Sequence, residues 1–361
     1  MKKVMIGMSG GVDSSAAALI LKNQGYDVVG VTLEMFSDED IVICGNARNN
    51  GNLSGAGDAK GVAERLGFQH LTVDMKDSFR KNVMEYFCNS YLCGRTPNPC
   101  IECNRCVKFG DMLKIAKEKG CDYIATGHYA VCEYDEKSGR YLLKRSADRS
   151  KDQTYMLYSL TQEQLAHTLF PLGNLEKSAV REIAAENGLI NADKPDSQDI
   201  CFVPDGKYVE LIEKFTGKKS VSGNYTDISG KVLGKHNGHI NYTKGQRKGL
   251  GISLGKPAYV VEKDYKTNTV VLGEEKDLYT MSLIAENVNL ISVEEITEPM
   301  RITAKARYSQ RDCAATLSKM ADGNYLVEFD EPQRAVTSGQ AVVFYDGDIV
   351  VGGGTIVKGI D

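Results

Sequence analysis

Residues 4–24 read VMIGMSGGVDSSAAALILKNQ, and this stretch decides the fold of the first part of the chain. The apolar run Val4–Met8 predicts a short strand, and the Ala- and Leu-rich run Ser14–Gln24, which Gly25 stops, predicts a helix. Between them lies SGGVDSS, Ser9–Ser15, whose glycines let backbone N–H groups converge beside a helix start of positive potential. The stretch therefore predicts an anion cradle whose ligand is a phosphate group.

The following segments continue the alternation of strands and helices. The β-branched run Asp27–Met35 predicts a second strand and completes a βαβ unit. Further strands are predicted at His70–Met75 and Asp122–Ala125, and helices at Asp58–Leu66, Asp77–Leu92 and Val107–Lys119. This alternation predicts an α/β domain with a parallel sheet. In such sheets ligands bind at the carboxyl ends of the strands.

Length and patterning predict three domains. A chain of 361 residues with 42% hydrophobic content can bury more than one core. We expect a catalytic α/β domain over 1–202, a less regular, glycine-rich central domain over 203–275, and a small antiparallel barrel over 276–361, where apolar and polar residues alternate between turn signals. Eight of the thirteen residues in 45–57 are Asn or Gly, which predicts a mobile surface loop.

Charge and cysteine content limit the class of protein. With 44 basic and 48 acidic residues the net charge is −4, so any nucleic-acid contact must come from local basic patches. We find no secretion signal or apolar run of membrane-spanning length, and we expect a soluble, cytoplasmic protein. Ten cysteines in such a chain are expected to be buried, metal-binding or reactive thiols rather than a disulfide framework.

The glycine loop differs from two common nucleotide-binding motifs. No lysine follows Gly11, which excludes the pattern G-x-x-x-x-G-K-[ST], and G-x-G-x-x-G is absent as well. Asp13 in place of the lysine suits a pyrophosphate held together with Mg²⁺, which prefers carboxylate and phosphate oxygens. The simpler alternative is a turn that only caps a helix.

SGGVDSS resembles the PP-loop of the N-type ATP pyrophosphatases, a loop family that also contains amidating enzymes. Six further segments are similar in order and spacing to the tRNA-specific 2-thiouridylases: GRTPNPCIECN (94–104), ATGHYA (125–130), KDQTYMLY (151–158), DSQDICF (196–202), YTKGQRKGLGI (242–252) and SGQAVVFYDG (338–347). The resemblance implies an adenine nucleotide alpha hydrolase-like domain. It also implies ATP-dependent adenylation of the C2 oxygen of the wobble uridine of tRNA, release of AMP and pyrophosphate, and sulfur transfer that yields 2-thiouridine.

The resemblance also assigns binding residues. Those implied for ATP are Gly7, Met8, Ser9, Gly10, Gly11, Val12, Asp13, Ser14, Leu33 and Gly127, with Asp13 reaching Mg²⁺ at the pyrophosphate. Those implied for tRNA are Asn98, Pro99, Cys100, His128, Lys151, Asp152, Gln153, Lys244, Arg247, Lys248, Arg307, Tyr308 and Gln340. Residues 235–256 hold five cations and no acid, which independently favours a phosphate-facing patch. A satisfied core histidine is the alternative at position 128, and an exposed helix start is the alternative at 151–153.

Two cysteines lie in the matching motifs and suit sulfur chemistry, because a thiol must be activated or carry a persulfide to attack. By similarity Cys201 carries the persulfide, and Cys103 frees the sulfur or closes a disulfide with Cys201. A cysteine desulfurase or a relay protein is the expected sulfur donor. We interpret Cys88, Cys93, Cys121, Cys132 and Cys313 as buried structural thiols.

Cys100 departs from the family pattern, because many relatives have an aspartate there, which leaves an acid/base role for this position in doubt. The resulting CxxCxxC spacing of Cys100, Cys103 and Cys106 is also typical of iron–sulfur or zinc ligands. An iron–sulfur cluster at Cys100, Cys103 and Cys201 is therefore a second route for sulfur. Two other functions stay open: an amidating enzyme of the same loop family, which would need neither thiol, and an RNA-binding metal protein with a vestigial nucleotide site.

Overall fold

A computed structural model describes residues 1–37, 55–192, 194, 200–203 and 206–361. The Asn/Gly-rich segment falls largely outside these residues, and so does most of the DSQD sequence that precedes Ile200. No helix among the described residues is long and apolar enough to cross a membrane.

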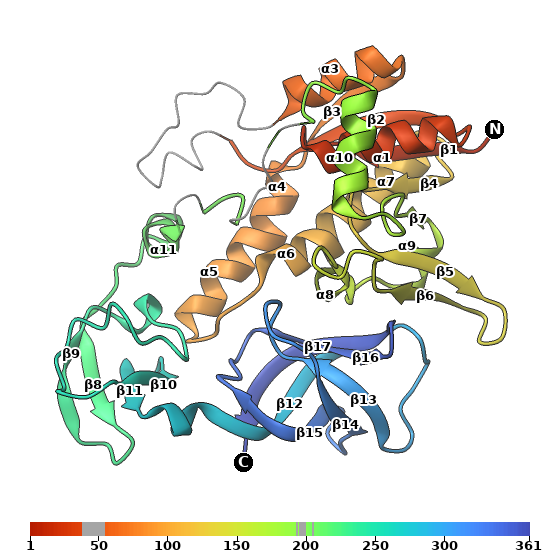
Figure 1. Ribbon diagram of the computed structural model, residues 1–361. Coiled ribbons are helices and arrows are strands. Elements are labelled where there is room, and N and C mark those ends of the chain that lie inside the picture. The colour runs from red at the N-terminus through yellow and green to blue at the C-terminus, as the bar shows by residue number, and fades with distance from the viewer. Residues whose placement is uncertain (38–54, 193, 195–199, 204–205) are drawn as a thin grey trace.

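The first domain is built on a five-stranded parallel sheet in the order β3-β2-β1-β4-β7 (Figure 1). Its strands are β1 (Lys3–Gly7), β2 (Asp27–Glu34), β3 (Gln69–Asp74), β4 (Tyr123–Ala125) and β7 (Thr168–Leu169). The predicted parallel sheet is confirmed, although β7 was not predicted because two residues carry no periodic signal. The strand order reverses between β1 and β4, and such a switch point opens a crevice for a ligand.

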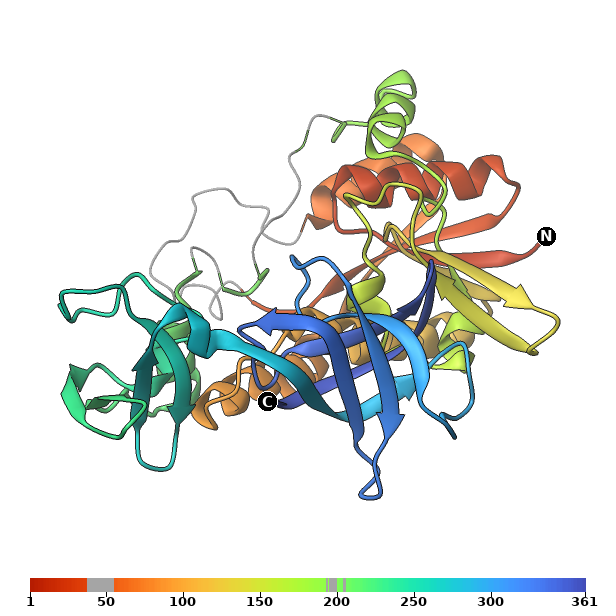
Figure 2. The same ribbon diagram turned by 60° about the horizontal axis from the view of Figure 1, so that its bottom comes forward.

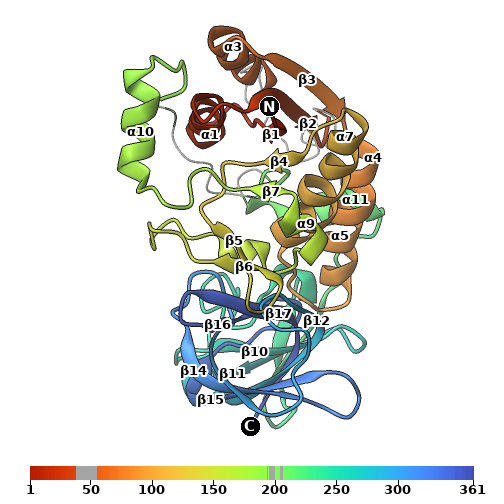
Figure 3. The same cartoon turned by 90° about the vertical axis from the view of Figure 1, so that its right-hand side faces the viewer.

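Helices cover both faces of this sheet (Figure 3). On one face α1 (Val12–Asn23) packs with α3 (Ala56–Leu66) and α10 (Lys177–Glu186) through the alanines of α1 and through Val180 and Ala184. On the other face lie α4 (Lys76–Phe79) and α7 (Met112–Glu118). Between them along the chain come η1 (Arg80–Met84), α5 (Glu85–Leu92), α6 (Pro99–Glu102) and η2 (Cys103–Asp111), and α9 (Gln162–Ala166) precedes β7.

The helix predicted to begin at Val107 begins eight residues earlier, at Pro99. The side chain of Asn98 accepts a hydrogen bond from the backbone N–H of Cys100 at 3.2 Å, and proline at the first helical position needs no such bond. The cysteine motif is therefore helical rather than a loop. Cys103 opens η2, a π-helix that runs to Asp111.

The central domain is more regular than expected. Strands β8 (Gly223–Asp227), β9 (Val232–His236), β10 (Tyr259–Asp264) and β11 (Thr269–Gly273) form a sheet in the order β10-β11-β8-β9, preceded by α11 (Tyr208–Thr216) (Figure 2). Its glycines mask the strand pattern in the sequence, but Tyr225, Val260 and Leu272 give the sheet a buried core.

The C-terminal domain is the predicted antiparallel barrel. It contains β12 (Tyr279–Leu290), β13 (Met300–Lys305), β14 (Cys313–Lys319), β15 (Tyr325–Arg334), β16 (Ala341–Asp346) and β17 (Ile349–Ile360). Pairing of β12 with both β15 and β17 closes it. A hairpin of the first domain, β5 (Val131–Asp135) and β6 (Arg140–Lys144), extends the same sheet through β17. The remaining short elements are α8 (Thr154–Leu157), η4 (His239–Asn241) and η5 (Glu275–Leu278).

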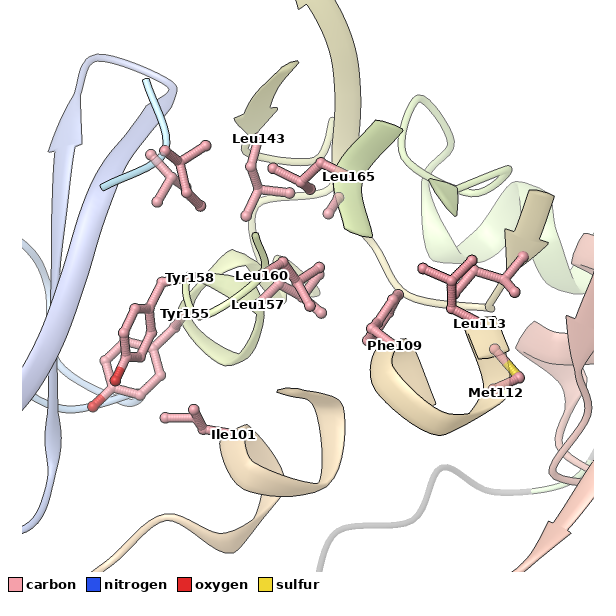
Figure 4. Close-up of a cluster of buried hydrophobic side chains, with 14 of the residues drawn as sticks. Ile101, Phe109, Met112, Leu113, Leu143, Tyr155, Leu157, Tyr158, Leu160 and Leu165 are labelled. Carbon is pink, nitrogen blue, oxygen red and sulfur yellow. The ribbon is translucent and has the colours of Figure 1, made fainter. Parts of the chain in front are cut away.

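A buried apolar cluster joins the first domain to the barrel. Figure 4 shows Tyr155, Tyr158 and Leu160 lying between Ile101 and Leu143, and the cluster continues into the barrel through Val343 and Tyr345. The Tyr155 hydroxyl donates to the carbonyl of Ala341 at 2.8 Å. The barrel is therefore held in a defined position relative to the parallel sheet of the first domain.

Candidate functional site

The glycine loop lies at the carboxyl end of β1 and runs directly into α1. A Cβ on Gly10, where φ is +73°, would lie 2.5 Å from the carbonyl oxygen of Gly55, so only glycine fits. Ser14 Oγ donates to the carbonyl of Gly11 at 3.1 Å and accepts from the backbone N–H of Ser9 at 3.3 Å. These bonds fold residues 7–14 into a tight turn over the positive end of a twelve-residue helix.

Two neighbouring strands complete the edge around this loop. A Cβ on Gly127, which follows β4, would lie 2.7 Å from the backbone nitrogen of Ser14. Leu33 lies near the carboxyl end of β2, and Thr32 on the same strand donates through Oγ1 to the carbonyl of Met8 at 2.9 Å. The structure thus brings the residues predicted for ATP together at one edge of the sheet.

Asp13 has two protein partners that sequence reasoning missed. Lys177 Nζ lies 2.7 Å from Oδ1 and 2.8 Å from Oδ2 of Asp13, and the hydroxyl of Tyr129 donates to Oδ1 at 2.8 Å. Lys177 is the first residue of α10 and lies 164 positions after Asp13, so no local sequence motif indicates the contact. A carboxylate with one ammonium and one hydroxyl partner is well fixed beside the phosphate cradle.

Asn191 and Lys194 also hold the loop and were not predicted. Asn191 Nδ2 donates to the carbonyls of Gly10 and Gly11 at 3.2 and 3.1 Å, and to Ser15 Oγ at 2.7 Å. Lys194 Nζ donates to the carbonyl of Gly10 at 3.2 Å. Both residues precede Cys201 in the sequence.

The thiols of Cys100, Cys103 and Cys201 lie close enough to influence one another's pKa. Cys103 is buried, with Sγ 3.8 Å from Sδ of Met35, the residue directly after β2, whereas Cys100 and Cys201 reach the surface. Burial raises the pKa of Cys103 to about 11 and that of Cys201 to about 12. The thiols of Cys103 and Cys100 add to the rise at Cys201, and the ammonium of Lys108 opposes it. All three are therefore protonated thiols at neutral pH in this conformation.

The thiols do not form a metal centre in this conformation. Within the described part of the chain, no three His, Cys, Asp or Glu side chains are placed to hold a metal ion. Cys106 lies 4.0 Å from the carboxylate of Glu102, and burial raises its pKa. The arrangement of Cys100, Cys103 and Cys201 does not fit the iron–sulfur cluster that their spacing suggested.

The remaining described cysteines are mostly structural, as expected. Cys88 and Cys121 are buried, and Cys132 and Cys313 are half-buried. The expectation was wrong for Cys93, which directly follows α5 and is exposed.

His128 follows β4, is half-buried, and has an internal partner at one ring nitrogen. One ring nitrogen lies 2.8 Å from Thr126 Oγ1, and the ring packs against Phe109 and Phe170 with centroids 5.7 and 6.4 Å apart. Burial, aided by Lys108, holds the pKa of His128 well below its usual value, so the imidazole is neutral.

The residues of 151–153 expected at tRNA also make internal contacts. The Asp152 carboxylate accepts from the backbone N–H of Ser146 at 3.0 Å and from Thr154 Oγ1 at 2.6 Å. Gln153 Oε1 accepts from the backbone N–H of Tyr129 at 2.9 Å. The segment directly precedes α8, as the helix-start alternative expected, but its residues are half-buried rather than exposed.

Three residues expected at tRNA meet around one hollow of about 210 Å³ where the domains join. It is lined by Thr96, Thr243, Arg307, Tyr308, Ser309 and Gln340. Gln340 donates to the carbonyl of Thr96 at 2.9 Å, and Arg307 Nη2 donates to the carbonyl of Lys244 at 3.1 Å. Arg307 Nε and Thr96 Oγ1 are buried without a hydrogen-bond partner among the described residues, which leaves polar atoms for a ligand.

The basic patch of the central domain is smaller than its sequence suggested. Lys256 pairs with Glu274 at 2.8 Å, an acid outside the predicted window. Lys244 is half-buried, and burial lowers its pKa. Arg247 and Lys248 are exposed, and Arg247 lines a second hollow of about 450 Å³.

Comparison with known proteins identifies the family. Residues 2–205 match the profile of the tRNA methyl transferase HUP domain, 210–274 that of the tRNA methyl transferase PRC-barrel domain, and 280–356 that of the aminomethyltransferase beta-barrel domain. The chain is 52% identical over 360 residues to the tRNA-specific 2-thiouridylase MnmA of Clostridioides difficile, with 99% of each chain covered. The chain belongs to the family of tRNA-specific 2-thiouridylases.

Two further relatives carry the same name. The protein of Acetivibrio thermocellus is 55% identical, with 98% of this chain and 99% of that protein covered. The protein of Lachnoclostridium phytofermentans is 53% identical, with 99% and 100% covered. The resemblance expected from the sequence is thus confirmed over the full length of this chain.

Proposed function

We propose that this chain is an ATP-dependent tRNA sulfurtransferase that converts the wobble uridine of tRNA to 2-thiouridine. One observation carries the proposal: a phosphate cradle and a group of thiols share one edge of a sheet. Cys103 contacts Met35 at the end of β2, beside the strand that enters the glycine loop. The name shared by the close relatives supports this function.

Activation of the base is the task of the glycine loop. The C2 oxygen of uracil is a poor leaving group, and transfer of AMP to it makes it a good one. We assign the phosphates of ATP to the turn over α1, where backbone N–H groups and the helix start favour negative charge. Asp13 suits a Mg²⁺ ion, which would neutralise the departing pyrophosphate.

Sulfur transfer is the task of Cys201 and Cys103. A persulfide on Cys201 presents its terminal sulfur to C2, the new C–S bond forms, and AMP leaves with the original oxygen. Cys103 then attacks the inner sulfur of Cys201, so the S–S bond to the product breaks and a Cys103–Cys201 disulfide forms. In the variant order, Cys103 frees hydrosulfide first, and hydrosulfide attacks C2. Either order needs an external persulfide donor and a thiol reductant in each cycle.

The hollow lined by Arg307, Tyr308 and Gln340 is our candidate contact for the anticodon stem-loop. Its unpartnered Arg307 Nε and Thr96 Oγ1 suit edge hydrogen bonds to an unstacked base, and the Tyr308 ring suits stacking. Asn98 to Cys100, at the start of α6, is placed next to Cys103 and is our candidate contact for the target base.

The test is to incubate the chain with tRNA, ATP, Mg²⁺ and a persulfide donor, and to measure AMP and 2-thiouridine together. We expect one AMP for each 2-thiouridine, and no AMP release above background from Asp13→Asn at unchanged tRNA binding in the absence of ATP. AMP release with nitrogen incorporation would favour the amidating alternative. Thiolation that requires bound iron and is lost in Cys100→Ser together with that iron would favour the cluster route.

A further inference from the structure

The segment Asp148–Gln153, whose last three residues are expected to contact tRNA, is tied to Asp13 of the nucleotide loop by two separate bridges. Each bridge consists of one buried residue that bonds the segment with its backbone and Asp13 with its side chain. These residues are Tyr129 and Lys177.

The first bridge runs through Tyr129, which is 2% exposed. Its backbone N–H donates to Gln153 Oε1 at 2.9 Å, and its carbonyl accepts from the backbone N–H of Gln153 at 3.0 Å. Its hydroxyl then reaches Asp13 Oδ1 at 2.8 Å. Because the phenol is rigid and enclosed, a shift of Gln153 displaces the hydroxyl at Asp13.

The second bridge runs through Lys177, which is 9% exposed. Its backbone N–H donates to Asp148 Oδ2 at 3.1 Å, while its ammonium holds both oxygens of Asp13 at 2.7 and 2.8 Å. Asp148 is itself fixed by Ser150, whose hydroxyl donates to Oδ1 at 2.6 Å. The segment therefore sets where the helix that carries Lys177 begins.

We propose that Tyr129 and Lys177 are positioning residues that couple tRNA contact at Asp148–Gln153 to ATP binding at the glycine loop. This inference rests on the proposed function. A tRNA that holds the segment in this arrangement also holds the Tyr129 hydroxyl and the Lys177 ammonium at Asp13, so the tRNA-bound chain binds ATP more tightly. Such coupling is reciprocal: each ligand strengthens the other by the same factor.

The test is equilibrium binding of a non-hydrolysable ATP analogue to the full chain, with and without saturating unmodified tRNA. For the unaltered chain we expect tRNA to tighten analogue binding by about fivefold or more. Tyr129→Phe and Lys177→Met should bring this factor close to one, and Lys177→Arg should restore part of it. Tyr123→Phe is the matched control, because its hydroxyl accepts from Lys2 Nζ at the opposite end of the same sheet.

Thermal unfolding shows which variants are folded, and only folded variants are compared. If the unaltered chain binds both ligands but tRNA leaves its affinity for the ATP analogue unchanged, the coupling is overturned and the proposed function stays intact. The coupling is supported if folded Tyr129→Phe has a factor close to one and folded Lys177→Arg keeps a factor between that of Lys177→Met and that of the unaltered chain. An undiminished factor in both Tyr129→Phe and Lys177→Met would overturn it. Failure of the unaltered chain to bind either ligand would contradict the proposed function and this inference together.

Discussion

At the scale of single residues, the thiols are held in a less reactive form than their exposure suggests. Cys201 reaches the surface, yet its pKa is raised to about 12, first by burial of the sulfur and then by the neighbouring thiols. A raised pKa leaves less thiolate at neutral pH. The sulfur that attacks is therefore expected to arrive as a loaded persulfide rather than to form from the resting thiol.

This state predicts the pH dependence of alkylation. Labelling of Cys201 by iodoacetamide should be slow at pH 7 and should still rise about tenfold per unit up to pH 10, because the pH stays below the pKa of about 12. A peptide that carries the same cysteine should level off above about pH 9. Mass spectrometry of timed samples measures both rates. A plateau for the folded protein near pH 8.5 would contradict the raised pKa.

Sequence reasoning at this scale found the residues that lie in motifs and missed those that act across the fold. The glycine loop, Asp13 and the cysteines stand in recognisable local patterns. Lys177 and Asn191 meet the loop only because α10 packs on α1 and the chain returns to the sheet edge. Nothing near them in the sequence indicates that contact.

At the scale of elements, the approach of β4 to α1 defines the nucleotide site. Gly127→Ala places a Cβ 2.7 Å from the backbone nitrogen of Ser14 and 2.8 Å from the carbonyl carbon of Asp13, so the helix start must move. We expect weaker ATP binding by about tenfold or more, because a small displacement misplaces the N–H groups of the cradle. Isothermal titration measures the affinity.

The matched control for this change is Gly61→Ala on α3, whose Cβ would meet only the end of the exposed Ile190 side chain. Alanine has a higher helix propensity than glycine, so the free energy of unfolding should rise slightly and the affinity for ATP should stay unchanged. Equal loss of affinity in both variants would show that the close approach at Gly127 is not the cause.

The exposed basic residues of the central domain predict the salt dependence of tRNA binding. Arg247→Ala and Lys248→Ala should each lower the log–log slope against salt by about 0.7–0.9, if each side chain meets one phosphate. Lys256→Ala is the control, because Lys256 already pairs with Glu274. An unchanged slope in the double variant Arg247→Ala, Lys248→Ala would show that neither side chain contacts a phosphate of tRNA.

Most elements of the first domain were predictable, since alternating apolar runs and helical segments carry strong local signals. The helix was predicted to begin at Val107 and its true start at Pro99 was missed, although Asn98-Pro99 is a good local signal for a helix start. The central sheet was missed because its glycines interrupt the alternation of side chains that indicates a strand. For the central sheet, packing rather than local pattern decided the outcome.

At the scale of the whole molecule, the central domain and the barrel both contact the first domain in the stretch from the end of α5 to α6. Arg95 pairs with Glu286 of the barrel at 2.7 Å, and the backbone N–H of Thr96 donates to the carbonyl of Ser338 at 2.8 Å. In the sequence these contacts lie just before α6, which leads to Cys103. A tRNA bound at the barrel and the central domain would therefore be held at a set distance from Cys103.

The central claim is that one chain performs two separable steps, activation by the glycine loop and sulfur transfer by Cys201 with Cys103. The most direct test follows AMP and 2-thiouridine in Cys201→Ser, with Cys93→Ser as the control for an exposed cysteine outside the site. We predict that Cys201→Ser still activates tRNA with ATP but forms no 2-thiouridine, and that Cys93→Ser does both. Formation of 2-thiouridine by Cys201→Ser would contradict the account at its centre.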